Sequence, residues 1–295
     1  MTLQFAGLKP RTVQSYRRAI RNFFRHLDDE ELPVPENSKR LDQCVSLYLE
    51  HMWQDDQPIT YAGHLMSGLK RFLPELRWRL PRAKQYYANW QSTHVTKQAN
   101  PFPPVVVMAY AGLAVATRQV SLAALLLVSF LAFLRTGELV SLAATKVAVN
   151  TALGRILVAL PSTKTSRQRE QTVCVEDHLV AKLVAYVLRQ GCQVFWEESA
   201  ASFRSTLKQF AAFFKLEEFA FSAYSLRRGG ASHAFTMGTS FDELLVRGRW
   251  QSARTARIYL DTGRAALIQQ RFSPSQASLL ATYSAKLERF CEQLR

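Results

Sequence analysis

The sequence predicts a mainly α-helical protein with one small antiparallel β-sheet. Apolar residues recur at helical spacing along most of the chain, and only three short β-rich runs interrupt them: TKVAVN, GRILVAL and QTVCV. A length of 295 residues fits one large domain or two ordinary ones. The stretch VTKQANPFPP at 95–104 is the best candidate for a linker, because prolines cluster there and the pattern changes after it.

The N-terminal part is expected to be a small helical bundle. Helical patterns separated by short proline-containing stretches run over 11–27, 40–55, 59–73 and 81–91. In the first of these, apolar residues follow one face, and basic residues occupy much of the rest: Arg11, Arg17, Arg18, Arg21 and Arg25. Taken alone, such a helix also fits an ordinary solvated face. We expect an N-terminal domain at 1–98 and a second domain at 99–295.

The second domain is expected to be helical around its small sheet. Helices are predicted at 104–117, 119–133 and 136–143, before the β-rich runs. The turn between the last two runs contains Lys164, within PSTKTS. Helical patterns then resume at 178–189, 199–214, 225–237, 240–247, 253–260 and about 274–294.

The charge of the chain indicates a polyanionic partner. Lys and Arg total 38 against 23 Asp and Glu, a formal net charge of +15. Basic residues outnumber acidic ones on both sides of residue 100, so the excess is not a single basic tail. Nucleic acid or an anionic membrane surface would suit such a charge.

Several classes of protein are disfavoured. The four cysteines are scattered without a CxxC pair, which argues against a zinc finger and a disulfide scaffold. The N-terminus lacks the apolar core of a signal peptide. The longest apolar run, Val120 to Leu134, is shorter than the roughly 20 residues of a membrane span and fits a buried helix better. No Walker or GxGxxG loop is found, so a nucleotide-driven motor is not expected.

Three motifs in the second domain combine charged and aromatic residues. In FLRTGEL, Arg135 ends an apolar run and Glu138 lies one helical turn later, a pattern that also fits a helix-start ion pair. In AYSLRRGG, Tyr224 and Arg227 share a helix face, although a basic surface turn would look similar. In GRWQSARTARIY, Trp250 and Tyr259 could equally be core residues.

Taken together, the motifs resemble those of the tyrosine recombinase (phage integrase) family. RTGEL, a hairpin lysine, LRR, and GxW with a tyrosine nine residues later follow that family's order over nearly the whole chain. The resemblance implies an N-terminal core-binding (SAM-like) bundle and a C-terminal α+β integrase-like catalytic domain. It implies that Arg135 and Arg227 are the active-site arginines and Tyr259 the nucleophile. Lys164 would be the hairpin lysine, Trp250 the His/Trp position and Glu138 the acidic residue after the first arginine.

One position departs from the family pattern. The family usually has histidine three residues before the second arginine, and this chain has Tyr224. A phenol can donate a hydrogen bond to a phosphate oxygen, but with an ordinary pKa near 10 it is a poor base at neutral pH. His233, nine residues later, is not expected to replace it.

The residue types also fit phosphoryl transfer on chemical grounds. Two guanidiniums can bind the non-bridging oxygens of a phosphodiester and stabilise the charge of its transition state. Tyr259 can then attack phosphorus to form a covalent phosphotyrosyl link, and Lys164 can protonate the leaving 5′ oxygen. Because the link retains the bond energy, neither ATP, a metal nor another cofactor is required.

The predicted function is therefore site-specific DNA recombination. Further contacts to duplex DNA are expected from Arg228 and Arg254, in addition to the arginines of the first helix. The resemblance implies a homo-tetramer on DNA, with the last helix docked on a neighbouring protomer or on its own domain. Two alternatives remain: a domesticated DNA-binding protein that has lost cleavage, and a type IB topoisomerase-like enzyme. We expect no membrane partner and an intracellular location, in the nucleus of a eukaryote or the cytoplasm or nucleoid of a prokaryote.

Overall fold

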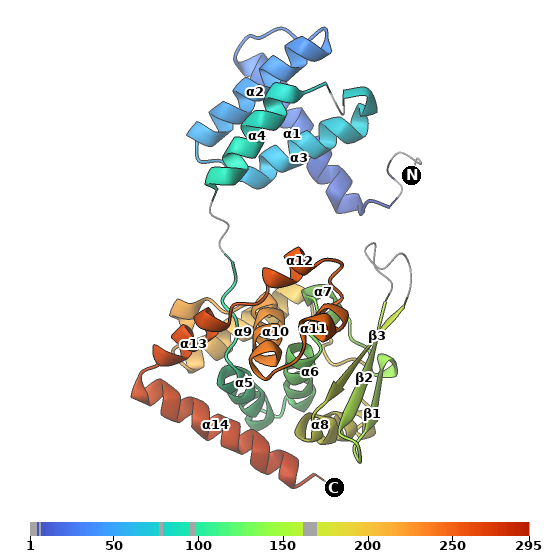
Figure 1. Cartoon of the computed structure of the whole chain (residues 1–295), viewed down its shortest axis with the longest axis vertical. Helices are drawn as coiled ribbons and strands as arrows, with labels where there is room; N and C mark the ends of the chain where they lie inside the picture. Colours follow the sequence, from blue (N-terminus) through green and yellow to red (C-terminus); the bar gives the residue numbers. More distant parts are fainter. Residues whose placement is uncertain (1–4, 6, 77–78, 95–97, 162–169, 295) are drawn as a thin grey trace. The chain divides into compact units, whose positions relative to one another are not determined.

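A computed structural model describes residues 5, 7–76, 79–94, 98–161 and 170–294 (Figure 1). Its contacts divide the chain into two compact units, Met1–Lys97 and Gln98–Arg295. The predicted fold class, mainly helical with one small antiparallel sheet, is confirmed. No helix in the described part of the chain has the length and apolarity that a bilayer crossing requires.

The N-terminal unit is a four-helix bundle with a short 3-10 turn at Pro74–Leu76. Its helices are α1 (Pro10–Asp29), α2 (Ser38–Gln54), α3 (Ile59–Phe72) and α4 (Pro81–Thr93), close to the predicted ranges. Helix α1 packs on α3, and α2 packs on α4. Their apolar faces form one core that includes Phe23, Val45, Leu49, Leu65 and Leu80.

A buried carboxylate fixes the start of α4. Asp42, on α2, is 4% exposed and accepts hydrogen bonds from the backbone N–H groups of Arg82, at 3.0 Å, and Ala83, at 2.9 Å. These N–H groups lie in the first turn of α4, where no intrahelical acceptor is available. These two hydrogen bonds offset the cost of burying the Asp42 carboxylate, and they join α2 to α4.

The second unit carries the remaining helices of the described chain, and a small sheet lies at one edge of it (Figure 1). The helices before the sheet are α5 (Pro104–Ala116), α6 (Val120–Leu131) and α7 (Thr136–Leu139). Those after it are α8 (His178–Arg189), α9 (Ala200–Phe213), α10 (Ala223–Thr236), α11 (Phe241–Gly248), α12 (Ala253–Arg257), α13 (Thr262–Gln270) and α14 (Pro274–Glu292). Short 3-10 turns lie at Ala144–Lys146 and Glu217–Phe219.

The sheet has three antiparallel strands in the order β1 (Val147–Asn150), β2 (Arg155–Leu160) and β3 (Gln171–Glu176), as predicted. The central strand pairs Val158 with Val147 on one side and with Val173 on the other. Alternate residues of β2 are buried, which is the pattern of a sheet with one face on the core. Helix α8 contacts β1 and β2 and covers that face.

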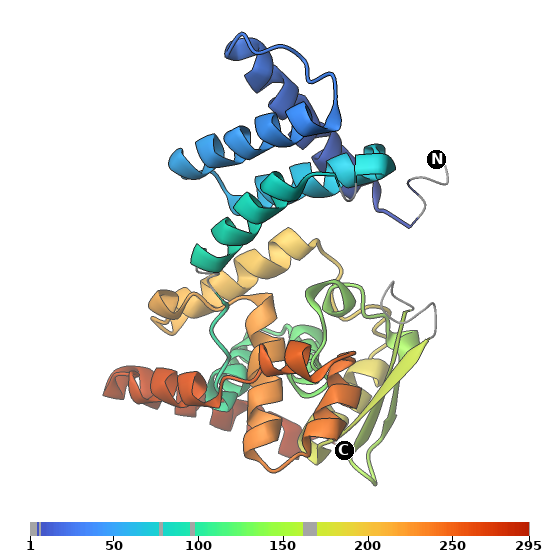
Figure 2. The ribbon, with the colours of Figure 1, turned by 45° about the horizontal axis from the view of Figure 1, so that its top comes forward.

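Helix α10 runs through the middle of the second unit in both ribbon views (Figures 1 and 2). It contacts α5, α6, α11 and α13. Two glycines permit this central position: a Cβ on Gly229 would lie 2.2 Å from the carbonyl oxygen of Phe102, and one on Gly230 would lie 1.8 Å from that of Phe130. Only residues without a side chain allow such close approach.

Two predicted helices are shorter than expected. The helix predicted at 136–143 ends at Leu139, and the one predicted at 253–260 ends at Arg257. In the second case the chain leaves the helix immediately before Tyr259, and α13 begins at Thr262 with Asp261 as its cap. The prediction had no helix at α13, whose apolar residues follow no clear amphipathic pattern.

The last helix packs on its own unit. Helix α14 crosses α5 and also contacts α8, and it buries Leu280, Leu287 and Cys291. Of the two arrangements left open for this helix, the structure therefore has docking on its own domain.

Candidate active site

Arg227 projects from α10 into the interior of the second unit. It is 1% exposed, and its two terminal nitrogens donate to backbone oxygens: one to Phe133, and the other to Gly248 at 2.5 Å. Its Nε has no hydrogen-bond acceptor within the described part of the chain. The guanidinium therefore joins the segment before α7 to the end of α11.

Arg135 lies at the start of α7 and is paired with Glu138. Its Nη1 is 2.8 Å from Glu138 Oε1, and its backbone N–H donates to Oε2 at 2.8 Å. The predicted helix-start ion pair is therefore present. Glu138 is buried, whereas the side chain of Arg135 remains 34% exposed, so part of this guanidinium is accessible to a ligand.

Arg249 is a third arginine at this site and was missed by the sequence analysis. Its Nη2 is 2.7 Å from Glu138 Oε2, and its side chain also donates to the backbone oxygens of Ala132 and Phe133. The sequence feature that could have indicated Arg249 is the motif GRW, in which this arginine lies directly before the predicted site residue Trp250. The backbone of Arg249 is left-handed, at φ 55°, and ends α11 so that the side chain turns inward.

Three aromatic rings form a cluster, and two of them lie against the Arg227 guanidinium. The Arg227 guanidinium carbon lies 4.8 Å from the ring centroid of Trp250 and 5.1 Å from that of Tyr259. Tyr259 lies 4.8 Å from Trp250 and 5.4 Å from Tyr224, centroid to centroid. The structure thus brings together six of the seven residues predicted to carry chemistry: Arg135, Glu138, Tyr224, Arg227, Trp250 and Tyr259.

Burial and charge shift several pKa values at this site. Burial lowers the pKa of Arg227, and the charge of Arg135 lowers it further. Burial also lowers the pKa of Arg249 to about 10, against the opposing effect of Glu138, so the Arg249 guanidinium stays charged at neutral pH. Burial raises the pKa of Tyr224, and a hydrogen bond with Tyr259 raises it further. Tyr224 is therefore a neutral phenol at physiological pH.

The site has the properties of an anion-binding centre next to a phenol. The Glu138 carboxylate pairs with two guanidiniums, those of Arg135 and Arg249, and the third, that of Arg227, donates to backbone oxygens instead, so the cluster keeps positive charge. Three buried donors of the site, Arg227 Nε, Arg249 Nε and Trp250 Nε1, have no acceptor within the residues the structure describes. Buried donors without acceptors are costly unless a ligand satisfies them. Such a site suits the oxygens of a phosphodiester.

Of two further predicted residues, one is not described and the other lies apart from this cluster. Lys164 lies outside the described residues, between β2 and β3. Arg228 is buried at 1% exposure and donates to Gln98 and to Asp261, the latter at 3.1 Å. Its side chain is therefore not available at the surface for a contact with DNA, which contradicts the prediction made for Arg228.

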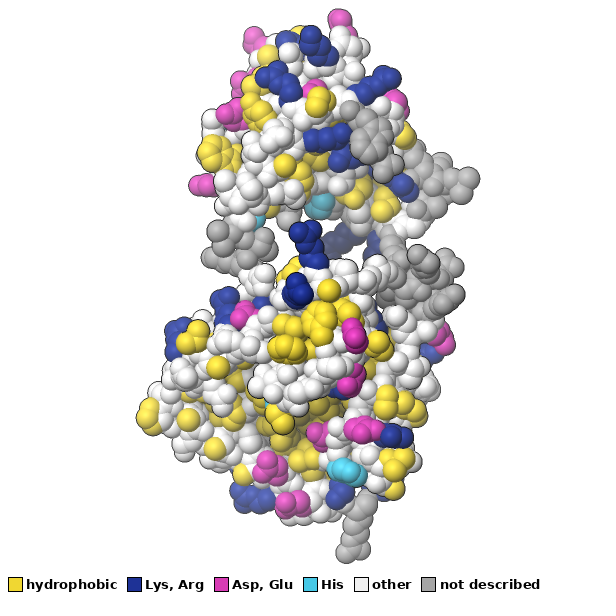
Figure 3. Space-filling view, viewed as in Figure 1, with side chains coloured by type: hydrophobic (Ala, Val, Ile, Leu, Met, Phe, Trp, Pro, Cys, Tyr) yellow, Lys and Arg dark blue, Asp and Glu magenta, His cyan; other side chains and the backbone are white. Residues whose placement is uncertain are grey.

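The other basic residues predicted to contact DNA lie at the surface. Arg254 is exposed on α12. On α1, the five predicted arginines are all exposed, and four of them, with Gln14 and Asn22, line a shallow hollow: Arg17, Arg18, Arg21 and Arg25. Lys and Arg side chains are seen at several places on the visible face of the N-terminal unit (Figure 3).

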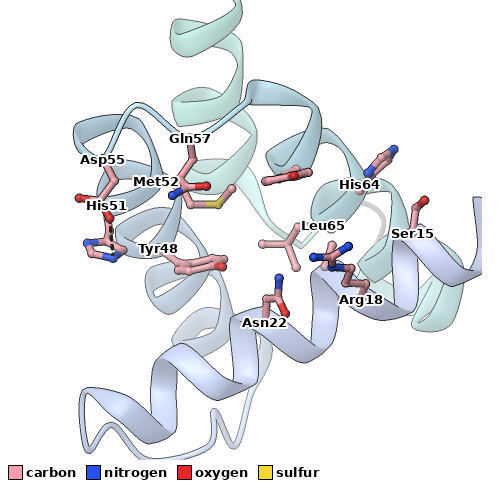
Figure 4. Close-up of a pocket in the computed structure, with 12 residues that line it drawn as sticks. Ser15, Arg18, Asn22, Tyr48, His51, Met52, Asp55, Gln57, His64 and Leu65 are labelled. Carbon is pink, nitrogen blue, oxygen red and sulfur yellow. Dashed lines mark ion pairs between the residues drawn. The ribbon is translucent and has the colours of Figure 1, made fainter.

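A second hollow of the N-terminal unit lies between α1, α2 and α3 (Figure 4). Arg18 and Asn22 reach into it from α1, opposite Tyr48 on α2, and they also line the basic hollow. At its edge His51 Nε2 is 3.3 Å from Asp55 Oδ2. The hollow contains none of the residues predicted to carry chemistry. Within the described residues, no group of three or more His, Cys, Asp or Glu is placed to hold a metal ion.

The fold is that of known integrases. No protein-family model and no curated protein matches the sequence. Among solved structures, a lambda integrase dimer bound to a COC′ core site is similar with a TM-score of 0.60 and 12% identity, over 87% of this chain and 73% of that one. The Tn1549 transposon integrase in complex with transposon right end DNA is similar with a TM-score of 0.57 and 10% identity, over 90% and 96%. The same integrase with circular intermediate DNA gives 0.57 and 11%, over 87% and 98%. At these identities the likeness shows the fold, which is the one the motifs predicted.

Proposed function

We propose that this chain is a site-specific DNA recombinase that cleaves and rejoins strands through a 3′-phosphotyrosyl intermediate. The observation that carries the proposal is the position of the buried Arg227 guanidinium, about 5 Å from both the Trp250 and the Tyr259 rings. A phenol placed beside buried cationic donors is the arrangement that attack on a phosphodiester requires.

In the proposed reaction, the oxygen of Tyr259 attacks phosphorus and the bond from phosphorus to the 5′ oxygen breaks. Arg135 and Arg227 bind the non-bridging oxygens, whose negative charge grows in the transition state. Trp250 donates its indole N–H, which has no acceptor in the described part of the chain, to one of these oxygens. Two guanidiniums supply this charge stabilisation without requiring a metal ion.

Tyr224 acts in this scheme as a hydrogen-bond partner of the nucleophile. Its pKa is raised, so it remains protonated at neutral pH and can orient Tyr259 or donate to a phosphate oxygen. It cannot accept the proton that Tyr259 loses, and that proton passes to water. We therefore expect cleavage to be slower than with a histidine at this position.

Lys164 is proposed as the general acid that protonates the leaving 5′ oxygen. The covalent intermediate keeps the energy of the phosphodiester bond. A 5′-hydroxyl from another strand can then attack the phosphotyrosine and release Tyr259, which joins the new strand without ATP.

The remaining basic residues are proposed to hold the duplex. The exposed arginines of α1, and Arg254 on α12, would contact phosphates, which position DNA without specifying its sequence. Exchange between two sites needs two duplexes, so we propose that four protomers assemble on DNA.

The experiment begins by selecting bound sequences from a pool of random duplexes. Two labelled duplexes carrying the selected site are then incubated with the protein, in the presence of a metal chelator. A recombinase joins label from one duplex to the other, whereas Tyr259→Phe binds DNA equally and yields no joined product. Relaxation of a single supercoiled plasmid without strand exchange would instead indicate a topoisomerase-like enzyme.

A second candidate function is DNA binding without cleavage, on the same scaffold. Tyr224 favours it, because a neutral phenol stands where a base would help and also hydrogen-bonds the nucleophile. In that case the selected duplex is bound, but neither strand exchange nor a covalent adduct forms at any pH.

A further inference from the structure

Two adjacent arginines of α10 serve different parts of the second unit. Consecutive residues of a helix point about 100° apart, so Arg227 and Arg228 diverge. Arg227 faces the aromatic cluster with Tyr259. Arg228 shares its face with Ser232, one turn later, and both contact the segment that follows Tyr259.

The segment after Tyr259 is held by α10 at three points. Ser232 Oγ donates to the backbone oxygen of Tyr259 at 3.2 Å and accepts from the N–H of Asp261 at 2.9 Å. Arg228 Nη2 is 3.1 Å from Asp261 Oδ2. The other oxygen of Asp261 accepts from the N–H of Arg264 and starts α13. These contacts fix the backbone on the C-terminal side of the proposed nucleophile.

The other end of the Arg228 guanidinium reaches the start of the second unit. Nη1 donates to the side-chain oxygen of Gln98, which is the first residue of that unit. The chain that follows is tied to the N-terminal part of α10, because the N–H of Phe102 donates to the backbone oxygen of Ser225 at 3.1 Å. One buried guanidinium thus binds both the entry of the unit and the Tyr259 segment.

We propose that Arg228 is a positioning residue that couples the entry of the second unit at Gln98 to the placement of Tyr259. The proposal rests on the proposed function for its catalytic consequence, but the coupling itself is a property of the fold. A guanidinium at 1% exposure needs acceptors for its hydrogens. When Gln98 moves away, the guanidinium loses one acceptor and its bond to Asp261 is disturbed. DNA that pulls on the chain at Gln98 would in this way change how firmly Tyr259 is held.

The test uses the full chain, four single variants and the double variant Arg228→Lys with Gln98→Ala. Gln98→Ala removes one acceptor, Asp261→Asn removes the charge of the other, and Arg228→Lys keeps the charge but cannot reach both. Glu218→Gln is the control, because it breaks an exposed ion pair of the same unit, with Arg271 at 2.6 Å. Thermal unfolding first establishes that each variant is folded.

Hydrogen exchange gives a readout that does not depend on activity. We expect Gln98→Ala to speed exchange of the amides at 259–262 at least about threefold, as the loss of one hydrogen bond would. We expect the same in Asp261→Asn and no change in Glu218→Gln. In an Arg228→Lys background, Gln98→Ala should add nothing at these amides, since the connection is already lost. Faster exchange confined to 98–102 in Gln98→Ala would overturn the proposal.

Cleavage provides the second readout. On a nicked duplex of the selected site, Gln98→Ala and Asp261→Asn should slow formation of the covalent adduct about tenfold while the Kd for DNA stays within about twofold. A purely structural role would lower binding and cleavage together. Equal cleavage rates in wild type and both variants would also overturn the proposal. If the wild type forms no adduct, the proposed function fails, and the exchange experiment still decides the coupling.

Discussion

Arg249 and Glu138 form a buried ion pair, with 2.7 Å between Nη2 and Oε2, and this pair holds together the segments that carry the candidate active site. Both side chains are less than 10% exposed. The same carboxylate also binds Arg135, so one buried glutamate places two guanidiniums from distant parts of the chain. Arg249 further donates to Ala132 and Phe133, the backbone immediately before Arg135.

Removing Arg249 is therefore expected to destabilise the second unit. Arg249→Met leaves the Glu138 carboxylate paired with Arg135 alone and takes the Arg249 donor from the Ala132 oxygen, while the Phe133 oxygen keeps only Arg227. This should cost about 3–5 kcal/mol of unfolding free energy. Arg271→Gln, which breaks an exposed pair, should cost about 1 kcal/mol or less. Denaturant unfolding measures both. Equal small losses would show that the Arg249 network contributes little to stability.

The close contact of α10 with α6 gives a second prediction. Gly230→Ala would place a methyl group 1.8 Å from the backbone oxygen of Phe130, so α10 must shift, at a cost of about 3 kcal/mol. Gly263→Ala, in α13, meets open space and should stabilise the protein by about 0.5 kcal/mol. The midpoint of thermal unfolding should move in opposite directions. A Gly230→Ala variant as stable as wild type would mean that the two elements are not packed this closely.

Replacing Tyr224 tests the role of this position in cleavage. The raised pKa keeps the wild-type phenol protonated up to and beyond pH 10, so Tyr224 should add no ionisation to the pH–rate profile between pH 6 and 9. Tyr224→His introduces a group with a pKa of about 6.5, whose basic form accumulates as pH rises. We expect single-turnover cleavage by this variant to rise through that pH and to exceed wild type by about tenfold or more above it.

Tyr224→Phe is the matched control, because it removes the hydroxyl and keeps the ring. It should cleave more slowly than wild type, with the same shape of profile. If Tyr224→His is slower than wild type at every pH, the position does not serve proton transfer.

The basic face of α1 predicts the salt dependence of DNA binding. Arg21→Gln should weaken binding to all duplexes alike and lower the slope of log K against log salt by about 1, because one phosphate contact is lost. Arg289→Gln, on α14, removes the same charge from a helix that we do not propose to touch DNA. It should leave the slope unchanged. Equal slopes for wild type and Arg21→Gln would exclude this face of α1 from the DNA contact.

The sequence predicted much of the fold and most members of the candidate site. Helical spacing located α1 and α6, and three short β-rich runs located the sheet, because those patterns are local. Arg135, Arg227, Trp250 and Tyr259 could be grouped in advance because their motifs follow a familiar order, and the structure brings them together.

What escaped prediction depends on contacts between distant segments. Arg228 and Arg254 have the same side chain, yet one is buried against Gln98 and Asp261 and the other is exposed. Arg249 was overlooked for the same reason, since its acceptors come from Ala132 to Glu138, far away in the sequence. Charge alone did not distinguish arginines that hold the fold from those that face solvent.

The central claim is that Tyr259 becomes linked to DNA, and mapping the linked residue tests it most directly. A duplex of the selected site, nicked so that the cleaved end diffuses away, traps the adduct, and mass spectrometry identifies the modified peptide. We predict a 3′-phosphate on Tyr259 in wild type, and no adduct in Tyr259→Phe. An adduct on Tyr224, whose ring centroid lies only 5.4 Å away, or no adduct with a duplex that is bound, would contradict the account.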